Sequence, residues 1–306
     1  MSDNSVRGHF LWHELMTTDP KAAIAFYSKV IGWESQNWDQ NPDYTLLAYE
    51  GSPMAGVMKL PPEAKAMGAR PSWTTYIGVD DVHVSAWEAQ RLGAKVLRGP
   101  EKTPTVGTWA ILQDPQGAVF AIHQPDLKPK VGGEPGLGDF SWHELATTNH
   151  AAAFAFYQKL FGWKKTGSFD MGSSGTYVMF GPARKSVGGV YTKGQDAPGP
   201  AAWVPYVRVP DVKPTAKLIA AAGGTIVNAP MEVPDGTWIA VAKDPQGAGF
   251  AVHSVPKKEK PVRKPAARKS AKGGKKVTRR TAKKAKKTKI KSPKSKSKKT
   301  KNAKRK

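Results

Sequence analysis

The chain repeats itself, and this repeat constrains its fold more than any other feature of the sequence. Residues 8–33 read GHFLWHELMTTDPKAAIAFYSKVIGW and residues 138–163 read GDFSWHELATTNHAAAFAFYQKLFGW, so 16 of 26 positions are identical at an offset of 130. The closing stretches, residues 107–123 and 236–253, align at an offset of 129 before one inserted residue and of 130 after it. A nearly constant offset at both ends indicates duplication of a whole domain of about 120 residues, a size that supports its own core.

The order of predicted elements within each copy places the chain in the α+β class. In the first copy, alternating residues predict a strand over His9–Thr17. Asp19 and Pro20 then suit the N-cap and first position of a helix, which Gly32 ends. Three strand candidates follow, and the same pattern restarts at Trp73–Val79. Each copy is therefore predicted to hold two βαβββ modules.

Charge divides the chain into a nearly neutral body and a basic tail. Of the 48 Lys and Arg residues, 26 lie in residues 257–306, where Glu259 is the single acid, and the rest of the chain carries 22 bases and 23 acids. The tail has no aromatic residue and few large aliphatic ones, so we predict that it is disordered when free. We divide the chain into a first domain over 1–126, a linker over 127–137, a second domain over 138–255 and the tail over 256–306.

The tail composition predicts binding to polyanions. Its Ala-Lys and Ser-Pro-Lys steps resemble the tails of linker histones and of bacterial histone-like proteins. Such tails bind nucleic acid by neutralising phosphates, without base specificity. A merely solubilising tail, and a tail bound to polyphosphate or anionic lipid, are the alternatives. Nucleic acid is the favoured partner because it is the most abundant polyanion inside cells.

Composition also bounds the location of the protein. The chain has no cysteine, which excludes disulfides, thiolate ligands and cysteine nucleophiles and suits a reducing compartment. No run approaches the roughly 18 apolar residues of a membrane helix, and the first ten residues do not read as a signal peptide. We predict a cytoplasmic protein, with nucleoid association through the tail. The oligomeric state stays open.

Several short motifs recur in the same order in both copies. They are T-x-D, A-x-x-FY-x-x-x-x-GW, and a Trp followed shortly by DPQG, with Asn149 replacing the first Asp in the second copy. Together they resemble the vicinal oxygen chelate superfamily, which includes glyoxalase I, bleomycin-resistance proteins and extradiol dioxygenases. The WHEL opening is similar to a two-domain bacterial subgroup labelled glyoxalase or hydroxylase. The resemblance covers residues 8–125 and 138–255 and implies that each sheet curls into a cup that holds the ligand.

The resemblance also implies where a divalent metal would bind, and those positions carry unsuitable side chains. Enzymes of the superfamily usually hold the metal through His and Glu on the cup strands. The matching positions here hold Trp12, Thr74 and Ala121 in the first copy and Trp142, Val204 and Ala251 in the second. Trp, Val and Ala cannot coordinate a hard or borderline cation. We therefore expect no cofactor and a fold without its usual metal.

Other polar residues are expected on the same face of each predicted cup. Side chains two residues apart share a face of a strand, so Glu14 lies beside Trp12. A Glu–His pair there could act as a general base with its orienting partner, or be a structural hydrogen-bonded pair. The candidates are Glu14 and His123 in the first copy and Glu144 and His253 in the second. By the same parity, His13 and His143 fall on the opposite face and are expected to pack under the helix or to be satisfied by backbone groups rather than to act in catalysis.

Aromatic residues are expected to wall the ligand. A Trp ring suits an apolar wall, and its N–H needs a hydrogen-bond partner. Trp12 and Trp142 are the strongest candidates because they stand in the place of a metal ligand. The full set expected to line the cups is Trp12, Trp73, Tyr76, Trp109, Trp142, Trp203, Tyr206 and Trp238.

Three functions are compatible with these features. The first is a protein that binds a small organic ligand in Trp-lined cups, without the usual metal, and is tethered to nucleic acid by its tail. The second is an enzyme of the same superfamily, a lyase, isomerase or dioxygenase-like catalyst, that uses the Glu–His pairs. The third is a nucleoid architectural protein in which the folded body only spaces or dimerises the tails.

Overall fold

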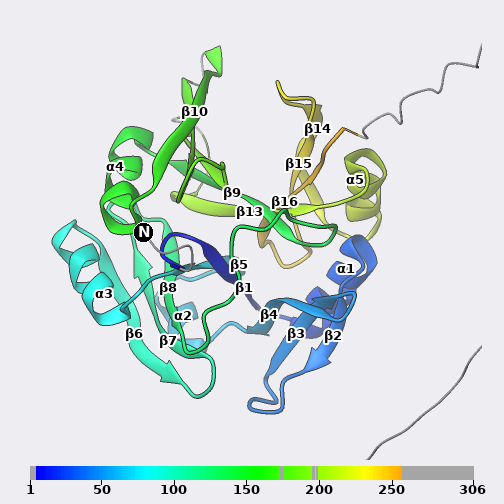
Figure 1. Ribbon diagram of the computed structural model, residues 1–306. Coiled ribbons are helices and arrows are strands. Elements are labelled where there is room, and N and C mark those ends of the chain that lie inside the picture. The colour runs from blue at the N-terminus through cyan, green and yellow to red at the C-terminus, as the bar shows by residue number, and fades with distance from the viewer. Residues whose placement is uncertain (1–4, 173–174, 195–196, 198, 257–306) are drawn as a thin grey trace, which may run out of the picture. The chain divides into compact units, whose positions relative to one another are not determined.

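The computed structural model describes residues 5–172, 175–194, 197 and 199–256. Among the described residues the same order of elements occurs twice, with one additional short helix in the first repeat (Figure 1). The first repeat comprises β1 (Phe10–Thr17), α1 (Pro20–Ile31), β2 (Glu34–Asn37), β3 (Tyr44–Tyr49), β4 (Ser52–Lys59), α2 (Pro62–Ala66), β5 (Ser72–Gly78), α3 (Val82–Arg91), β6 (Lys95–Thr103), β7 (Gly107–Gln113) and β8 (Val119–Pro125). The second comprises β9 (Phe140–Thr147), α4 (His150–Phe161), β10 (Lys164–Asp170), β11 (Thr176–Gly181), β12 (Gly188–Thr192), β13 (Ala202–Arg208), α5 (Val212–Ala221), β14 (Thr225–Glu232), β15 (Trp238–Lys243) and β16 (Gly249–Ser254).

Each repeat forms one eight-stranded mixed sheet. The first has the order β2-β3-β4-β1-β5-β8-β7-β6, and the second has the equivalent order β10-β11-β12-β9-β13-β16-β15-β14. Within a repeat the two βαβββ modules meet where β1 pairs antiparallel with β5, while β1 also pairs parallel with β4. This topology confirms the α+β class and the doubled modules. Among the described residues, no helix is long and apolar enough to cross a membrane.

Local signals place the first helix of each repeat. The Asp19 side chain accepts a hydrogen bond from the Ala22 N–H, and Gly32 ends α1 in the left-handed conformation at φ 88°. Asn149 caps α4 in the same way, so the replacement of Asp by Asn keeps the cap. Two features were not predicted: the short helix α2, and the extension of β6 as far as Thr103. The predicted disordered tail falls on residues 257–306, outside the described residues.

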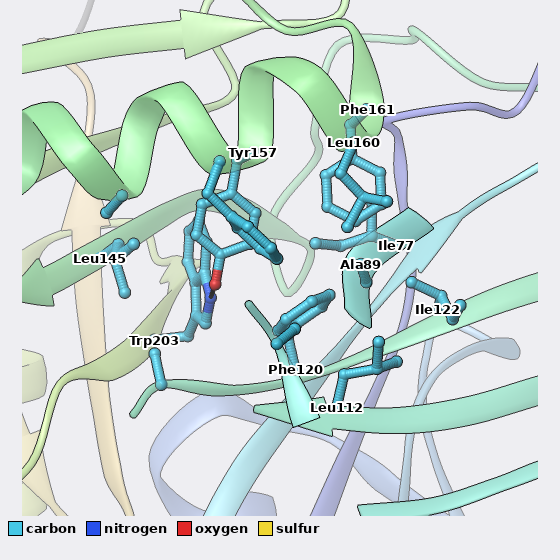
Figure 2. Close-up of a cluster of buried hydrophobic side chains, with 14 of the residues drawn as sticks. Ile77, Ala89, Leu112, Phe120, Ile122, Leu145, Tyr157, Leu160, Phe161 and Trp203 are labelled. Atoms are coloured by element: carbon cyan, nitrogen blue, oxygen red, sulfur yellow. Dashed lines mark hydrogen bonds between the residues drawn. The ribbon is translucent and has the colours of Figure 1, made fainter. Parts of the chain in front are cut away.

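The hydrophobic core is shared between the two repeats. One cluster joins α3 and the inner side chains of β7 and β8 to α4 and to Trp203 of β13; Figure 2 shows Tyr157, Leu160 and Trp203 of the second repeat beside Phe120 and Leu112 of the first. The other cluster joins α1 to α5 and to the inner side chains of β15 and β16. Figure 1 accordingly shows α1 beside α5 and α3 beside α4. The size of one copy suggested a self-contained core, and the structure corrects that expectation.

Hydrogen bonds related by the repeat link the two halves. The Tyr27 hydroxyl donates to Asp244 Oδ2 at 3.2 Å, and the Tyr157 hydroxyl donates to Asp114 Oδ2 at 2.9 Å. The two aspartates belong to the DPQG turns, where their other oxygen accepts backbone N–H groups. The FY and DPQG motifs of the sequence therefore connect one repeat to the other. Two tryptophans add matching bonds to backbone carbonyls, Trp33 to Gly138 and Trp163 to Gly8, at 2.9 and 2.8 Å.

His13 and His143 meet where the two sheets face each other. Their Nε2 atoms are 2.8 Å apart, so one ring donates a hydrogen bond to the other. Phe10 stacks on His143 with ring centroids 3.4 Å apart, and Phe140 stacks on His13 at 3.7 Å. Both histidines are buried. His143 also has the backbone partner that the sequence analysis allowed, because its Nδ1 lies 3.1 Å from the Val187 carbonyl oxygen. The contact between the two histidines was not predicted.

Candidate functional site

Each sheet has one face against the shared core and another that we call the cup face. In the first repeat Glu14 and Trp12 share this second face of β1, while His13 and Leu15 point into the core. Cross-strand register adds Tyr76 opposite Trp12 and Thr74 opposite Glu14. Further along the same face lie Ala121, His123, Trp109 and Ile111, with Tyr44, Gly56 and Met58 on the other side of β1.

A buried carboxylate is the centre of the first cup face. The Tyr76 hydroxyl donates to Glu14 Oε1 at 3.2 Å, and the Tyr44 hydroxyl lies close enough to Glu14 to oppose the rise in its pKa. Trp12 Nε1 in turn donates to the Tyr44 oxygen at 2.9 Å. The chain Trp12–Tyr44–Glu14–Tyr76 thus satisfies the polar atoms of residues that are half-buried or buried.

The second repeat reproduces this chain with different local sequence. Tyr177 donates to Glu144 Oε2 at 3.0 Å, and Trp142 Nε1 donates to the Tyr177 oxygen at 2.9 Å. The Tyr206 hydroxyl lies close enough to Glu144 to oppose the rise in its pKa. The tyrosines Tyr44 and Tyr177 were missed by the sequence analysis. They are 133 residues apart, so an alignment at the constant offset of 130 does not superimpose them.

A glycine makes room for each of these two tyrosines. A Cβ on Gly56 would lie 1.8 Å from the Tyr44 hydroxyl oxygen, and a Cβ on Gly189 would lie 2.0 Å from the Tyr177 ring. Gly56 is the β4 neighbour of Glu14, and Gly189 is the β12 neighbour of Glu144. At these positions a side chain would displace the tyrosine from the carboxylate.

Burial governs the electrostatics of both carboxyl groups. Loss of hydration raises the pKa of Glu14, against the opposing effects of the Tyr44 and Tyr76 hydroxyls and of the Arg98 charge. Burial likewise raises the pKa of Glu144, opposed by Tyr177 and Tyr206. Burial and the neighbouring Glu144 charge raise the pKa of Tyr191, on the same face, to about 12. A raised pKa in an apolar surrounding is typical of carboxyl groups that take part in proton transfer.

The structure separates the expected Glu–His pairs. Among the described residues no hydrogen bond joins Glu14 to His123, because Tyr76 of β5 lies between them; its ring centroid is 6.4 Å from that of His123. His253 Nε2 is 2.9 Å from Ser141 Oγ rather than bonded to Glu144. The base-and-orienter pairing expected from the sequence is therefore corrected: tyrosines, not histidines, hold the two carboxylates.

Five of the eight expected wall residues lie on the cup faces: Trp12, Tyr76, Trp109, Trp142 and Tyr206. Trp109 lies opposite His123, donates to Thr103 Oγ1 at 2.9 Å, and stacks under the Arg98 guanidinium at 5.2 Å. Its exposure is intermediate, as is that of Trp12 and Trp142. These rings form the apolar part of the candidate site.

The other three expected wall residues lie on the opposite face. Trp73 and Trp203 are core residues, and their Nε1 atoms donate to the buried Tyr27 and Tyr157 hydroxyls at 2.8 and 3.1 Å. Trp238 packs against the shared core under Lys213 of α5, whose Nζ is 3.7 Å from the ring centroid. The inserted residue shifts the register, so that Ile239 rather than Trp238 lies opposite His253.

The cup faces do not offer the donor set of the superfamily metal. Thr74 lies beside Glu14 and Ala121 beside Tyr76, so each Glu is a single carboxylate among tyrosines and apolar side chains. Within the described ranges, no group of three His, Cys, Asp or Glu side chains is placed to hold a metal ion. A His/Glu metal centre needs three or four such ligands. The residues present do not fit the usual metal.

An open hollow of about 760 Å³ occurs elsewhere in the first repeat, between the start of α1 and the ends of β2, β3 and β4. Its lining includes Pro20, Lys21, Asp43 and Lys59. It shares no residue with the Trp12–Tyr44–Glu14–Tyr76 chain. The hydrogen-bonded carboxylate, rather than this hollow, therefore marks the candidate site.

Sequence comparison identifies the family. Residues 13–123 match the model of a glyoxalase-like domain, and residues 140–252 match that of the glyoxalase/bleomycin resistance protein/dioxygenase superfamily. The protein named "Putative glyoxylase CFP32" of Mycobacterium bovis is 32% identical over 248 residues, which are 79% of this chain and 92% of that protein. The chain belongs to the glyoxalase/bleomycin resistance protein/dioxygenase superfamily. The family resemblance inferred from the repeated motifs is thus confirmed.

Other members of the superfamily share the two-repeat architecture. Anthracycline biosynthesis protein DnrV of Streptomyces peucetius is 27% identical over 257 residues, covering 79% of this chain and 91% of that protein. The Mn(II)-bound glyoxalase from Novosphingobium aromaticivorans aligns with a TM-score of 0.57 at 17% identity, over 82% of this chain and 83% of that one. The 2,3-dioxygenase LapB from Pseudomonas sp. KL28 aligns with a TM-score of 0.58 at 10% identity, over 82% and 93%. These two structures show a common fold.

Proposed function

We propose that the cup faces bind a small, largely apolar organic ligand without the usual metal, and that Glu14 and Glu144 anchor its polar group. One observation carries the proposal: both repeats hold a carboxylate, buried at Glu14 and half-buried at Glu144, that accepts a hydrogen bond from a tyrosine, beside a tryptophan that donates to a tyrosine hydroxyl. Removing a charged group from water costs free energy unless the group is hydrogen-bonded or binds a ligand. The occurrence of such a carboxylate in both repeats therefore favours a functional role. The half-buried Trp12 and Trp142 supply apolar surface beside it.

The ligand class follows from this chemistry. A carboxylate beside half-buried tryptophan rings suits a ligand with one hydroxyl donor on a planar apolar body. A phenol is the simplest such molecule. The name of the relative DnrV, which refers to anthracycline biosynthesis, is compatible with a polycyclic hydroxylated ligand. We propose planar phenols as the first compounds to test.

A second proposal, proton transfer, rests on the raised pKa of the two carboxyl groups. In an enzyme of this kind Glu14 or Glu144 would take a proton from the bound hydroxyl or from a carbon next to a carbonyl group. A lyase or isomerase step of this type uses only the carboxylate and its tyrosine donors. The relative named a glyoxylase supports this direction. Loss of turnover with retained ligand binding in Glu14→Gln would separate catalysis from binding.

The binding proposal is tested by titrating the full chain with 4-nitrophenol and 1-hydroxyanthraquinone. We expect quenching of tryptophan emission and a rise in melting temperature with ligand concentration. Trp12→Ala should weaken binding by more than it lowers stability, whereas Trp73→Ala, at a core position, should mainly destabilise the fold by about 3–5 kcal/mol. Unchanged emission and melting temperature with every phenol tested would contradict the proposal.

We also propose that the tail tethers the protein to nucleic acid, since residues 257–306 carry 26 bases and one acid. Each neutralised phosphate contributes a slope of about −0.9 to log affinity against log salt on duplex DNA, so engagement of a third of the bases gives a slope on the order of −8. Binding should be independent of sequence. A chain ending at residue 256 should no longer bind duplex DNA. Tight DNA binding by that shortened chain, or a shallow salt slope for the full chain, would contradict the tether.

A further inference from the structure

The two cup faces match at Glu14 and Glu144, at Trp12 and Trp142 and at Tyr76 and Tyr206. They differ at their histidines and at Trp109, whose place opposite the histidine is taken by Ile239 in the second cup. In the second repeat His253 Nε2 lies 2.9 Å from Ser141 Oγ, and that same hydroxyl lies 3.2 Å from the Tyr206 carbonyl oxygen. Ser141 corresponds to Leu11 in the first repeat, where a hydrocarbon side chain offers no hydrogen bond. Both positions fall at the irregularity in register near the start of β1 or β9.

His123 is consequently left without a partner. Both of its ring nitrogens are buried, and neither makes a hydrogen bond within the described part of the chain. Burial lowers the pKa of His123; the nearby Val106 carbonyl and the Asp126 charge oppose this shift without giving a hydrogen bond of normal geometry. A neutral imidazole carries one donor and one acceptor, and almost all buried polar groups in native proteins are satisfied. An orphaned pair of ring nitrogens therefore indicates a missing partner.

His123 itself lies on the cup face, and its Nε2 packs against Gly107 at the start of β7. The ring lies opposite Trp109 on the neighbouring strand and edge-on to Tyr76, whose hydroxyl holds Glu14. The side chain is partly exposed although its nitrogens are not. Rotation about the broad χ2 torsion of the imidazole is the movement that would bring a nitrogen to a ligand there.

We propose that the two cups bind differently: His123 hydrogen-bonds a second polar group of a phenol whose hydroxyl lies at Glu14 in the first cup, whereas Ser141 already hydrogen-bonds His253 in the second. This inference rests on the proposed function, since it assumes that a phenol binds beside Glu14. The inference adds that Leu11 and Ser141 determine whether the histidine of each cup is free to bind the ligand. In the first cup a ligand oxygen takes the place that the Ser141 hydroxyl takes in the second.

The exchange of these two residues gives a direct test with the full chain and 4-nitrophenol as the probe. Leu11→Ser supplies His123 with the internal partner that His253 has, and Leu11→Ala removes the same side chain without adding a hydroxyl. We expect Leu11→Ser and His123→Phe to weaken the tighter site by about tenfold relative to Leu11→Ala, the effect of one hydrogen bond to the ligand. Ser141→Ala frees His253 and should strengthen the weaker site.

The readouts are the number and affinity of sites from calorimetric titration, together with ¹⁵N shifts of the histidine rings. On adding the probe, the His123 ring shifts should change and those of His253 should not. Equal binding by Leu11→Ser and Leu11→Ala, or equal losses from His123→Phe and His253→Phe, would overturn the inference. If probe binding is lost in Trp12→Ala but kept in His123→Phe and Leu11→Ser, the inference about His123 is wrong and the proposed function is retained. Failure of wild type to bind the probe at all would contradict both.

Discussion

At the scale of single residues, the account turns on a carboxylate whose surroundings the sequence only partly revealed. Alternation along β1 correctly placed Glu14 beside Trp12 and set His13 on the other face. The tyrosine partner Tyr44 was not found because the loop lengths differ between the repeats and remove it from the constant offset. Cross-strand neighbours depend on register, which a single sequence does not specify.

The misplaced tryptophans were within reach of the sequence. Trp73 and Tyr76 are three residues apart in one strand, so they cannot both face the cup in a regular strand. The same parity separates Trp203 from Tyr206. Trp238 needed one more step, because the residue inserted in the second repeat shifts its parity relative to Trp109. Parity within β5 and β13 alone would have kept Trp73 and Trp203 off the face that carries Tyr76 and Tyr206.

Gly56 provides a test of the carboxylate network at this scale. Its backbone is not in the left-handed region, so Gly56→Ala adds only a methyl group where the Tyr44 hydroxyl now lies. We expect displaced Tyr44, a stability loss of about 1–3 kcal/mol from overpacking, and weaker phenol binding. Denaturant unfolding and titration measure the two effects. Gly133→Ala, where an added Cβ meets nothing within 4 Å, is the matched control and should change neither; a neutral Gly56→Ala would refute the role given to Tyr44.

At the scale of elements, local sequence signals predicted the helices and strands, whereas features that depend on tertiary contacts were not predicted. The caps at Asp19 and Asn149 and the glycine stop at Gly32 are local signals, and the structure has each of them. The extension of β6 depends on pairing with β7, which its own residues do not encode. The contact of β1 with β9 through His13 and His143 depends on how the sheets pack, so sequence parity could say only that both side chains point inward.

This histidine contact predicts acid sensitivity. Burial lowers the pKa of His143 to about 3, and burial with the neighbouring His143 lowers that of His13 as well. Because the unfolded histidine titrates near 6.5, the unfolded chain binds more protons between that pH and the folded pKa. Stability should thus be complete above about pH 6.5 and fall as the pH drops, by up to about 1.4 kcal/mol per pH unit for each histidine.

Denaturant unfolding as a function of pH measures this dependence. His143→Gln keeps a hydrogen-bonding group beside His13 but cannot titrate, so its stability should fall less steeply below pH 6.5. His83→Gln changes an exposed histidine on α3 and should follow wild type. The raised pKa values of Glu14 and Glu144 act with the opposite sign and are common to all three proteins. Parallel pH profiles for wild type and His143→Gln would rule out the histidine contact as the cause.

At the scale of the whole molecule, the duplication was clear from the sequence but its consequence was not. The repeat motifs FY and DPQG read as signatures of one domain, whereas Tyr27 and Asp244, and Tyr157 and Asp114, join different repeats. Both hydrophobic clusters also take residues from both halves. Sequence similarity between copies cannot distinguish a core within each copy from a core exchanged between them, because both produce the same pattern.

Shared cores predict a single unfolding transition for residues 5–256. Neither repeat can lose its helices without exposing the apolar side chains of the other, so the two should unfold together. Calorimetry should give one peak, with the calorimetric enthalpy equal to the van't Hoff enthalpy. Tyr27→Phe and Tyr157→Phe, although in different repeats, should each lower the midpoint of that one transition. Two resolved transitions, each shifted by one of these substitutions, would show that the repeats are independent.

The central claim is that the buried carboxylates act in ligand binding without the metal typical of the superfamily. The most direct test is calorimetric titration of the full chain with 4-nitrophenol before and after dialysis against a chelator. We predict the same affinity and number of sites in both states, and loss of binding in the Glu14→Gln, Glu144→Gln double variant. Binding that disappears on chelation and returns with added Mn²⁺, Zn²⁺ or Ni²⁺ would contradict the account.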